Sequence, residues 1–224
     1  LDLPVPEPMT EVILIRHGVT AWNRQRRFQG SIDIPLEPEG HAEAEQAAVR
    51  LGELASLRPV SAIYCSALTR ARQTAEPIAR ALGLALAVEP GLGERHYGAF
   101  EGLTPVELER DWADEFRRWR EREPDFGLPG GGESLRAFYD RVNGALEALA
   151  LRHPGERVVA VTHGGVLDCA YRLASQIDLA AVRRHELLNA SLNTIVRGPA
   201  GWRVHDWGDV SHLQPTDSPD KRWS

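Results

Sequence analysis

The stretch Val12-Ile13-Leu14-Ile15-Arg16-His17-Gly18 decides how the rest of the chain is interpreted. Its short apolar run stops abruptly at an arginine–histidine pair followed by glycine. This pattern predicts a buried strand whose carboxyl end presents an imidazole beside a guanidinium. The stretch Val158-Val159-Ala160-Val161-Thr162-His163-Gly164-Gly165 repeats it near the other end of the chain. Two strands that each close on His-Gly indicate an active site.

Length, charge and cysteine usage restrict the class of protein. With 224 residues the chain can bury a full core. We expect one domain over residues 9–213, between a flexible N-terminal arm (residues 1–8) and a C-terminal tail (residues 214–224). A formal net charge of −6 disfavours contact with nucleic acid or an acidic membrane surface, and no apolar run is long enough to cross a bilayer.

The two cysteines and the first residues predict a cytoplasmic protein. Cys65 and Cys169 each lie in an apolar segment and form no CxxC pair, so we expect reduced core thiols. The N-terminal stretch has neither a basic start nor an apolar core and does not resemble a signal peptide.

Periodicity predicts an α/β fold. Apolar runs predict strands over residues 11–16, 62–65, 84–88, 157–161, 193–198 and 202–206. Helical spacing predicts helices over residues 44–54, 66–83, 104–111, 114–122, 135–149 and 164–174, and Ser66 is expected to cap the second of them. This alternation predicts a mainly parallel sheet covered on both faces. The long excursion over about residues 95–132 predicts a small helical cap over a site.

Sites in open α/β sheets form at the carboxyl ends of strands. Four strand ends would bring together two histidines, two arginines and one glutamate: Arg16, His17, Arg70, Glu94 and His163. Two histidines and a carboxylate could hold a metal ion, but fixed positive charges repel a divalent cation and attract an anion. A phosphate dianion therefore fits this set better, helped by backbone amides near Gly30 and Gly164.

The chemistry expected from this set is nucleophilic catalysis. His17 would attack phosphorus and become a phosphohistidine, and Glu94 would protonate the leaving alkoxide. The neighbouring cations should lower the pKa of His17 and keep the ring neutral. A hydrogen bond from the other ring nitrogen to a backbone carbonyl should fix its tautomer.

Several blocks of the sequence resemble the histidine phosphatase superfamily, also called the phosphoglycerate mutase-like family. Leu14-Ile15-Arg16-His17-Gly18 resembles its opening signature, and residues 66–75 resemble its second block. Leu92-Gly93-Glu94 is similar to its acid loop, and Thr162-His163-Gly164-Gly165 to its second histidine block. Residues 208–213 resemble a stretch of the broad-specificity phosphatase branch. The resemblance covers about residues 10–213.

The resemblance implies a three-layer αβα sandwich with a small cap, and a phosphomonoester hydrolase that needs no cofactor. It implies His17 as the nucleophile and Glu94 as the proton donor, acting on a small phosphorylated metabolite. By analogy it leaves a homodimer open. The residues expected around the substrate form a larger set: Arg16, Asn23, Gln29, Gly30, Arg70, Arg95, His96, His163 and Gly164.

A cofactor-dependent phosphoglycerate mutase is the alternative function, and it would need priming by a bisphosphate. Residues 95–103 resemble the mutase acid loop, but mutases follow it with a lysine where Thr104 and Pro105 stand here. The stretch Arg27-Phe28-Gln29-Gly30 resembles phosphatases. Residues 95–132 hold more carboxylates than arginines, although the arginines of residues 117–120 could gather locally. We therefore favour a phosphatase. A third alternative, a protein that binds phosphorylated ligands without catalysis, is disfavoured by the intact catalytic set.

Overall fold

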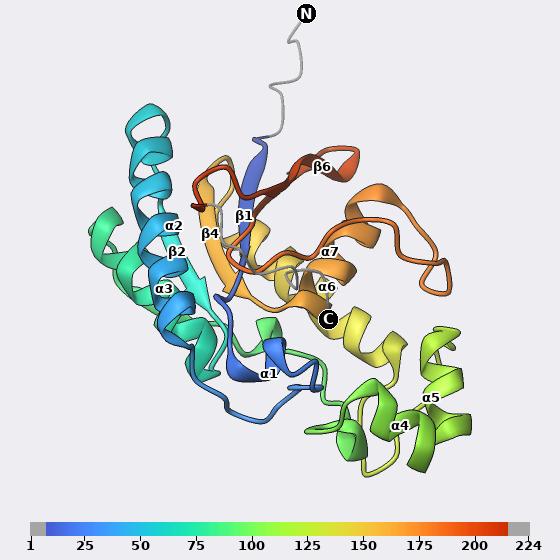
Figure 1. Ribbon diagram of the computed structural model, residues 1–224. Helices are drawn as coiled ribbons and strands as arrows, with labels where there is room; N and C mark the ends of the chain where they lie inside the picture. Colours follow the sequence, from blue (N-terminus) through green and yellow to red (C-terminus); the bar gives the residue numbers. More distant parts are fainter. Residues whose placement is uncertain (1–7, 215–224) are drawn as a thin grey trace, which may run out of the picture.

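A six-stranded sheet in the order β3-β2-β4-β1-β5-β6 organises the computed structural model, which describes residues 8–214 (Figure 1). The strands are β1 (Thr10–Arg16), β2 (Ala62–Cys65), β3 (Leu86–Val88), β4 (Arg157–Thr162), β5 (Leu192–Gly198) and β6 (Gly201–Asp209). The first four strands of this order run parallel, and β5 is antiparallel to both of its neighbours, β1 and β6. The prediction of a mainly parallel sheet is confirmed. Apart from Pro8 and Gln214, the predicted arm and tail lie outside the described residues.

Helices cover both faces of the sheet, as the alternation predicted. The helices α2 (Pro38–Leu57) and α3 (Thr69–Leu82) pack on one face, and α6 (Leu135–Arg152) and α7 (Gly164–Ser175) on the other (Figure 1). Successive side chains of a strand point to opposite faces. Val12 and Leu14 therefore join the core under α6 and α7, whereas Ile13 and Ile15 join the core under α2 and α3. None of the described helices is long and apolar enough to span a membrane.

The connection from β2 to α3 differs from the prediction. Leu68, not Ser66, is the N-cap of α3, and no side chain caps it. The hydroxyl of Ser66 instead contacts the buried ring of His163. At the other end, Gly83 closes α3 in the left-handed conformation with φ 64°, as expected for a glycine C-cap. A short helix, α1 (Ala21–Arg24), follows β1 and was not predicted.

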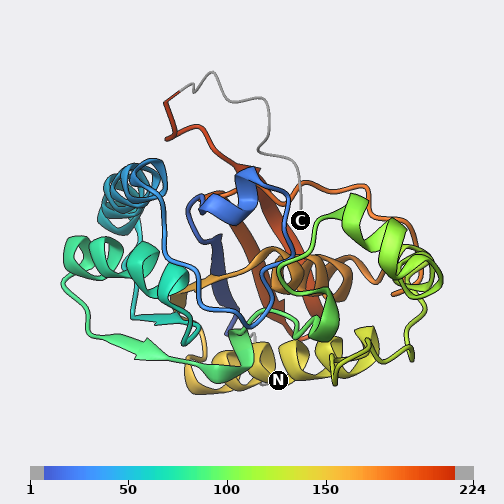
Figure 2. The same ribbon diagram turned by 60° about the horizontal axis from the view of Figure 1, so that its bottom comes forward.

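The predicted cap is present between β3 and α6. It contains two 3-10 turns, Pro90–Leu92 and Gly98–Phe100, and the helices α4 (Pro105–Asp111) and α5 (Ala113–Arg120). Figures 1 and 2 show α4 and α5 as a separate lobe at one end of the molecule. This lobe has its own apolar cluster, whose buried members are Phe100, Leu108, Phe116 and Leu128. Phe28, from the loop after α1, packs against this cluster and ties the cap to the end of β1.

Candidate active site

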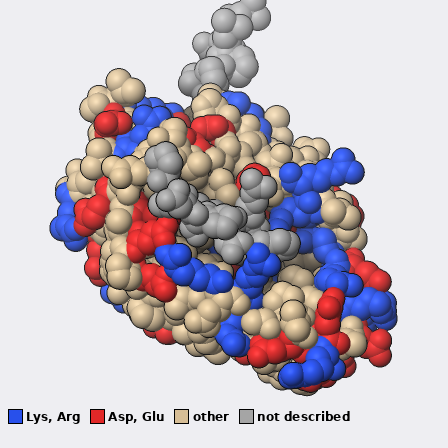
Figure 3. Space-filling model, in the orientation of Figure 1, with Lys and Arg blue, Asp and Glu red and all other residues tan. Residues whose placement is uncertain are grey.

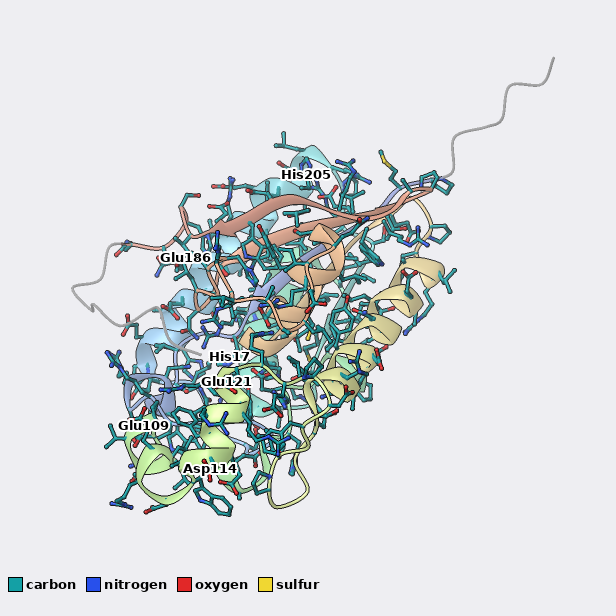
Figure 4. All side chains as sticks on the ribbon, turned by 90° about the vertical axis from the view of Figure 1, so that its right-hand side faces the viewer. His17, Glu109, Asp114, Glu121, Glu186 and His205 are labelled. Atoms are coloured by element: carbon teal, nitrogen blue, oxygen red, sulfur yellow. The ribbon has the colours of Figure 1, made fainter. Side chains whose placement is uncertain are left out.

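His17 and His163 lie together at the carboxyl ends of two neighbouring parallel strands. The last paired residues of β1 and β4 are Arg16 and Thr162, so the next residue of each strand reaches the same edge of the sheet. The two imidazole rings have centroids 5.2 Å apart, and both side chains are buried. Figure 4 shows His17 between the sheet and the cap helices that carry Glu109 and Asp114. The structure thus brings the two predicted histidines together.

The ring of His17 is held in one neutral tautomer. Its Nδ1 donates to Gly18 O at 2.7 Å, and because a carbonyl oxygen can only accept, Nε2 keeps its lone pair. Burial holds the pKa of His17 well below its usual value, and the charges of Arg70 and Arg16 lower it further. The direction is the one expected from the cationic neighbours, but burial is the larger cause.

The Gly18 carbonyl that fixes this tautomer is itself held in place. Gly18 N donates to Thr74 Oγ1 at 3.0 Å, and Asn189 Nδ2 donates to His17 O at 2.9 Å. A Cβ at Gly18 would lie 2.5 Å from Gly40 O, so the close approach of α2 requires glycine there. Sequence reasoning missed Thr74 and Asn189. Thr74 follows Arg70 by one helical turn, a usable signal, but Asn189 lies in an irregular segment that carries none.

His163 has one ring nitrogen engaged and one without a partner. Its Nε2 lies 2.6 Å from Ser66 Oγ. Ser66 Oγ also accepts from Leu68 N at 3.4 Å, which leaves the hydroxyl hydrogen for Nε2. The neutral ring then carries its own proton on Nδ1, which is buried and has no hydrogen-bond partner within residues 8–214. Burial, followed by the Arg70 charge, also holds the pKa of His163 well below its usual value.

Two buried guanidinium groups supply the positive charge. Arg16 and Arg70 are 2% and 1% exposed, and neither forms an ion pair with a carboxylate of the described chain. Arg70 donates to Gly30 O at 2.7 Å and to Ile32 O at 2.8 Å, and Arg16 donates to Leu187 O. The Nε of each has no partner within the described residues. Burial lowers the pKa of Arg16 to about 10, so the group remains cationic at neutral pH and favours an anionic ligand.

Glu94 reaches the site from the loop after β3. Its Oε1 accepts from Arg95 N at 2.8 Å, and its Oε2 accepts from Gly165 N at 3.1 Å. The second contact places the carboxyl group in the first turn of α7, beside His163, the residue that precedes this helix. The carboxyl is half-buried, so a substrate oxygen can approach it.

A cavity of about 440 Å³ opens over these groups. Most of the predicted residues line it: Arg16, His17, Asn23, Gln29, Gly30, Arg70 and Glu94. His163 lies against His17 without lining the cavity, and Gly164 follows it as the first residue of α7. Thr20 Oγ1 lies 3.0 Å from both Asn23 Oδ1 and Gln29 Oε1 and can donate its one hydrogen to either, which keeps these two amides at the rim.

The structure does not place Arg95 and His96 at this cavity. Arg95 donates to Glu133 O from Nε at 3.1 Å and from Nη2 at 2.8 Å, and it lines a neighbouring cavity of about 350 Å³. His96 N donates to Glu133 Oε2 at 3.0 Å, and its side chain lines neither cavity. The guanidinium of Arg95 is held by the carbonyl of Glu133 just before α6, whereas the bonds of His96 to Glu133 are made by its backbone.

The outer wall of the main cavity combines aromatic with charged side chains, Arg120 among the latter. Trp119 stacks on Phe116 with ring centroids 5.5 Å apart. Phe28 meets Trp119 edge-on at 4.9 Å and Tyr97 at 5.1 Å. Trp119 lies in the segment 114–122, which the sequence predicted as a helix of the cap. Phe28 and Tyr97 gave no separate signal because they come from loops that only the fold brings together.

Three groups of the site divide the work of a phosphoryl transfer. The guanidinium groups can hold an anion, the Nε2 lone pair of His17 can attack it, and Glu94 can move a proton. No cluster of three or more His, Cys, Asp or Glu side chains within residues 8–214 is arranged to hold a metal ion.

Known proteins resemble this chain over most of its length. The sequence model of the histidine phosphatase superfamily (branch 1) matches residues 12–210. A metal-independent phosphoserine phosphatase from Arabidopsis thaliana is 40% identical over 213 residues, which are 95% of this chain and 87% of that protein. Phosphoglycerate mutase-like protein 4 from the same plant is 37% identical over 208 residues, 92% of this chain and 88% of that one. The solved structure of a phosphoserine phosphatase mutant from Entamoeba histolytica, in complex with phosphoserine, matches with a TM-score of 0.80 at 26% identity, covering 92% of this chain and 100% of the other.

Proposed function

Since this chain belongs to the histidine phosphatase superfamily, branch 1, we propose that it is a metal-independent phosphomonoester hydrolase that works through a phosphohistidine on His17. One observation carries this proposal. The imidazole of His17 is neutral, with its tautomer fixed, and it lies beside buried guanidinium groups that have no carboxylate partner among the described residues. Such a site is complementary to a phosphate dianion facing a nucleophile.

In the first step the phosphate group of the substrate binds between Arg16, Arg70 and His163. His17 Nε2 attacks phosphorus in line, so that an N–P bond forms as the P–O bond to the leaving group breaks. The leaving alkoxide takes a proton from Glu94, and His163 Nδ1 donates a hydrogen bond to a phosphoryl oxygen. The first step therefore ends with phosphohistidine, an ionised Glu94 and a free alcohol.

In the second step a water molecule replaces the alcohol. The ionised Glu94 removes a proton from the water, whose oxygen attacks phosphorus while the N–P bond breaks. Inorganic phosphate leaves, and both Glu94 and the neutral ring of His17 are restored. The same carboxyl group thus serves as acid and then as base, which its place beside the cavity allows.

We propose that the substrate is a small phosphorylated metabolite whose leaving group has an apolar part. The aromatic wall formed by Phe28, Tyr97 and Trp119 faces the cavity above the phosphate, and apolar contact with it contributes binding energy. The relatives named phosphoserine phosphatases support a substrate of this size. We propose a cytoplasmic setting because both cysteines are free thiols buried in the core.

The charges of the cap support a phosphatase rather than a mutase. A mutase needs cations for a second anionic group, yet Arg117 pairs with Glu121 at 2.9 Å and Arg118 with Glu123 at 2.6 Å. Arg120, the third arginine of residues 117–120, likewise pairs with a glutamate at 2.9 Å. Figure 3 shows basic and acidic side chains interleaved over α4 and α5 at the lower right of that face. The three arginines therefore meet separate carboxylates instead of gathering.

The test is a comparison of two activities in the presence of EDTA. Phosphate release from a panel of phosphomonoesters is measured beside conversion of 3-phosphoglycerate to 2-phosphoglycerate, with and without 2,3-bisphosphoglycerate. We expect EDTA-resistant release without isomerisation. Isomerisation that depends on the bisphosphate, with little release, would replace this proposal by a mutase.

Two histidine variants make this test specific. His17→Ala should abolish turnover, because the imidazole nitrogen is the attacking atom. His205→Ala is the matched control, since His205 lies on β6, far from His17 (Figure 4), and should leave turnover unchanged. Activity that survives in His17→Ala would exclude the phosphohistidine.

A further inference from the structure

The loop that carries Glu94 has no strand or helix of its own beyond a 3-10 turn. We call residues 91–96 the acid loop; only its first two residues belong to the 3-10 turn Pro90–Leu92. The carboxyl group of Glu94 can serve as an acid only if this loop holds it still, since proton transfer depends on donor–acceptor geometry. Figure 2 shows the loop running beside α6, which crosses the lower part of the view. Its backbone carbonyls therefore find their partner on that helix.

One guanidinium on α6 gathers the carbonyl groups of the acid loop. Arg141 Nη1 donates to Gly91 O at 3.1 Å and to Gly93 O at 2.9 Å. Its Nη2 donates to Glu94 O at 3.3 Å. The remaining donors reach Glu133, with Nε to Oε1 at 2.9 Å and Nη2 to Oε2 at 2.8 Å. A guanidinium has five N–H donors in a rigid fork, and here each of them has an acceptor.

Glu133, which pairs with Arg141, also holds the last two residues of the acid loop. Its Oε2 also accepts from His96 N at 3.0 Å, and its backbone N donates to His96 O at 2.8 Å. Its backbone O accepts from the side chain of Arg95. Burial alone would raise the pKa of Glu133, but the hydrogen bonds from Arg141 and His96 N outweigh it and lower the pKa. Glu133 is therefore ionised at neutral pH.

The two side chains act at a distance from the chemistry. Neither Arg141 nor Glu133 lines the cavity over His17, so neither can touch a substrate there. Their side chains are 31% and 24% exposed, and an ion pair at that exposure contributes little to stability by itself. The Arg141–Glu133 pair is distinguished by its further hydrogen bonds, which reach backbone groups both before and after Glu94 in the acid loop.

We propose that Arg141 and Glu133 form a positioning pair, which fixes the acid loop so that Glu94 meets the leaving-group oxygen in the first chemical step. This inference rests on the proposed function, because it assigns the pair a role in proton donation by Glu94. The pair moves no proton itself. It determines where the carboxyl group stands when the P–O bond breaks.

If the pair acts by positioning Glu94, the loss of activity on removing the pair depends on the leaving group. If the pair only stabilises the fold, the loss is the same for all substrates. An alkoxide needs a proton as it departs, whereas 2,4-dinitrophenolate is stable without one. A displaced Glu94 therefore slows the release of an alcohol and spares the release of dinitrophenolate. The quantity to compare is kcat/KM, because it reports the steps up to departure of the leaving group and excludes the later hydrolysis of phosphohistidine.

The experiment measures kcat/KM for phosphoserine and for 2,4-dinitrophenyl phosphate in the full chain and its variants. Arg141→Lys keeps the charge but places all donors on one nitrogen, which cannot span the three carbonyls and the carboxylate. We expect it to lower kcat/KM for phosphoserine roughly 10- to 100-fold, and for dinitrophenyl phosphate less than about threefold. Glu133→Gln should follow the same pattern more weakly, and it provides a second variant if Arg141→Lys does not fold.

The matched control is another arginine of the same helix. Arg136 on α6 makes a two-pronged pair with Asp125, at 2.6 and 3.1 Å, and bonds no part of the acid loop. Arg136→Lys should leave both kcat/KM values unchanged. Equal losses on the two substrates for Arg141→Lys, or an equal selective loss for Arg136→Lys, would overturn the positioning role.

A double variant separates failure of this inference from failure of the proposed function. Glu94→Gln alone should lose activity on phosphoserine selectively. Once that acid is absent, adding Arg141→Lys should change kcat/KM for phosphoserine by less than about threefold, since the two changes act through one group. Fully additive losses would refute the pair while leaving the phosphatase intact. If Glu94→Gln shows no selectivity, the assignment of the acid falls, and this inference falls with it.

Discussion

Mild acid should remove a large part of the stability of this protein, because two buried histidines resist protonation. Burial, followed by the nearby charges, holds the pKa of His17 and of His163 well below 6.5 in the folded state. The unfolded chain has no such burial and takes up a proton on each ring near pH 6.5. Below that pH the unfolded state binds more protons than the folded state. The free energy of unfolding therefore falls as the pH falls.

The size of this effect follows from the number of rings. Each proton that only the unfolded state binds gives a slope of about 1.4 kcal/mol per pH unit. His17 and His163 together approach about 2.7 kcal/mol per pH unit, which integrates to a loss of about 3 kcal/mol between about pH 6.5 and 5. Carboxylates with lowered pKa values, such as Glu133, lose their contribution below about pH 4.5, outside this window. The loss is a large share of a typical domain stability of about 5–15 kcal/mol.

Urea unfolding at several pH values, in a buffer without phosphate, measures this slope. His17→Gln removes one of the two rings and should reduce the slope by about 1.4 kcal/mol per pH unit. His205→Gln, at an exposed position on β6, is the control for loss of a histidine elsewhere. A free energy of unfolding that stays level between pH 6.5 and 5, or an unchanged slope in His17→Gln, would refute the claim that these rings are buried and neutral.

Three further substitutions test other contacts, and two of them have a comparison variant. Gly18→Ala would bring a Cβ within 2.5 Å of a backbone oxygen of α2 and move the carbonyl that fixes the tautomer of His17. It should lower kcat more than tenfold, which raises the activation free energy by about 1.4 kcal/mol or more. Gly52→Ala, with nothing within 4 Å of the added Cβ, should instead raise the free energy of unfolding by about 1 kcal/mol. Ser66→Ala removes the 2.6 Å contact to the second histidine and should lower kcat about tenfold at similar KM. Asp168→Asn removes the carboxylate that pairs with Arg172 of α7, whose side chain is 0% exposed. It should lower the free energy of unfolding, measured in urea, by about 3–5 kcal/mol. Asp125→Asn, at an exposed pair, should cost less than about 1 kcal/mol.

The sheet could be predicted because its central strands are short apolar runs with sharp ends. In β1 and β4 the apolar residues are continuous, as expected for strands that are buried on both faces, and each run stops at a polar residue that must face the site. The ends of the helices were predicted less well. The hydroxyl of Ser66 looked like a cap by its place in the sequence, but a buried imidazole 97 positions later holds it instead. A contact over that distance has no local signal.

The residues expected around the substrate divide in the same way. Those that directly follow a strand, such as His17 after β1 and His163 after β4, lie where the strand directs them. Arg95 and His96 do not line the cavity. The carbonyl of Glu133 binds the guanidinium of Arg95, and no residue near position 95 in the sequence predicts that contact. Asn189 was missed because the segment between α7 and β5 has no periodic pattern, although it supplies a hydrogen bond to the nucleophile's own carbonyl.

The division of the cavity into a charged base and an aromatic wall has a consequence for specificity. In the proposed mechanism Arg16, Arg70 and His17 at the base meet the phosphate, which every phosphomonoester shares, so they would contribute the same binding energy for all substrates. The wall, with Phe28 and Trp119, would meet only the leaving group, so it can separate substrates whose leaving groups need the same help from Glu94. Once the alcohol has left, the phosphohistidine is the same whatever its source. Substitutions in the wall should therefore reorder the substrates by kcat/KM while leaving the rate of phosphohistidine hydrolysis unchanged.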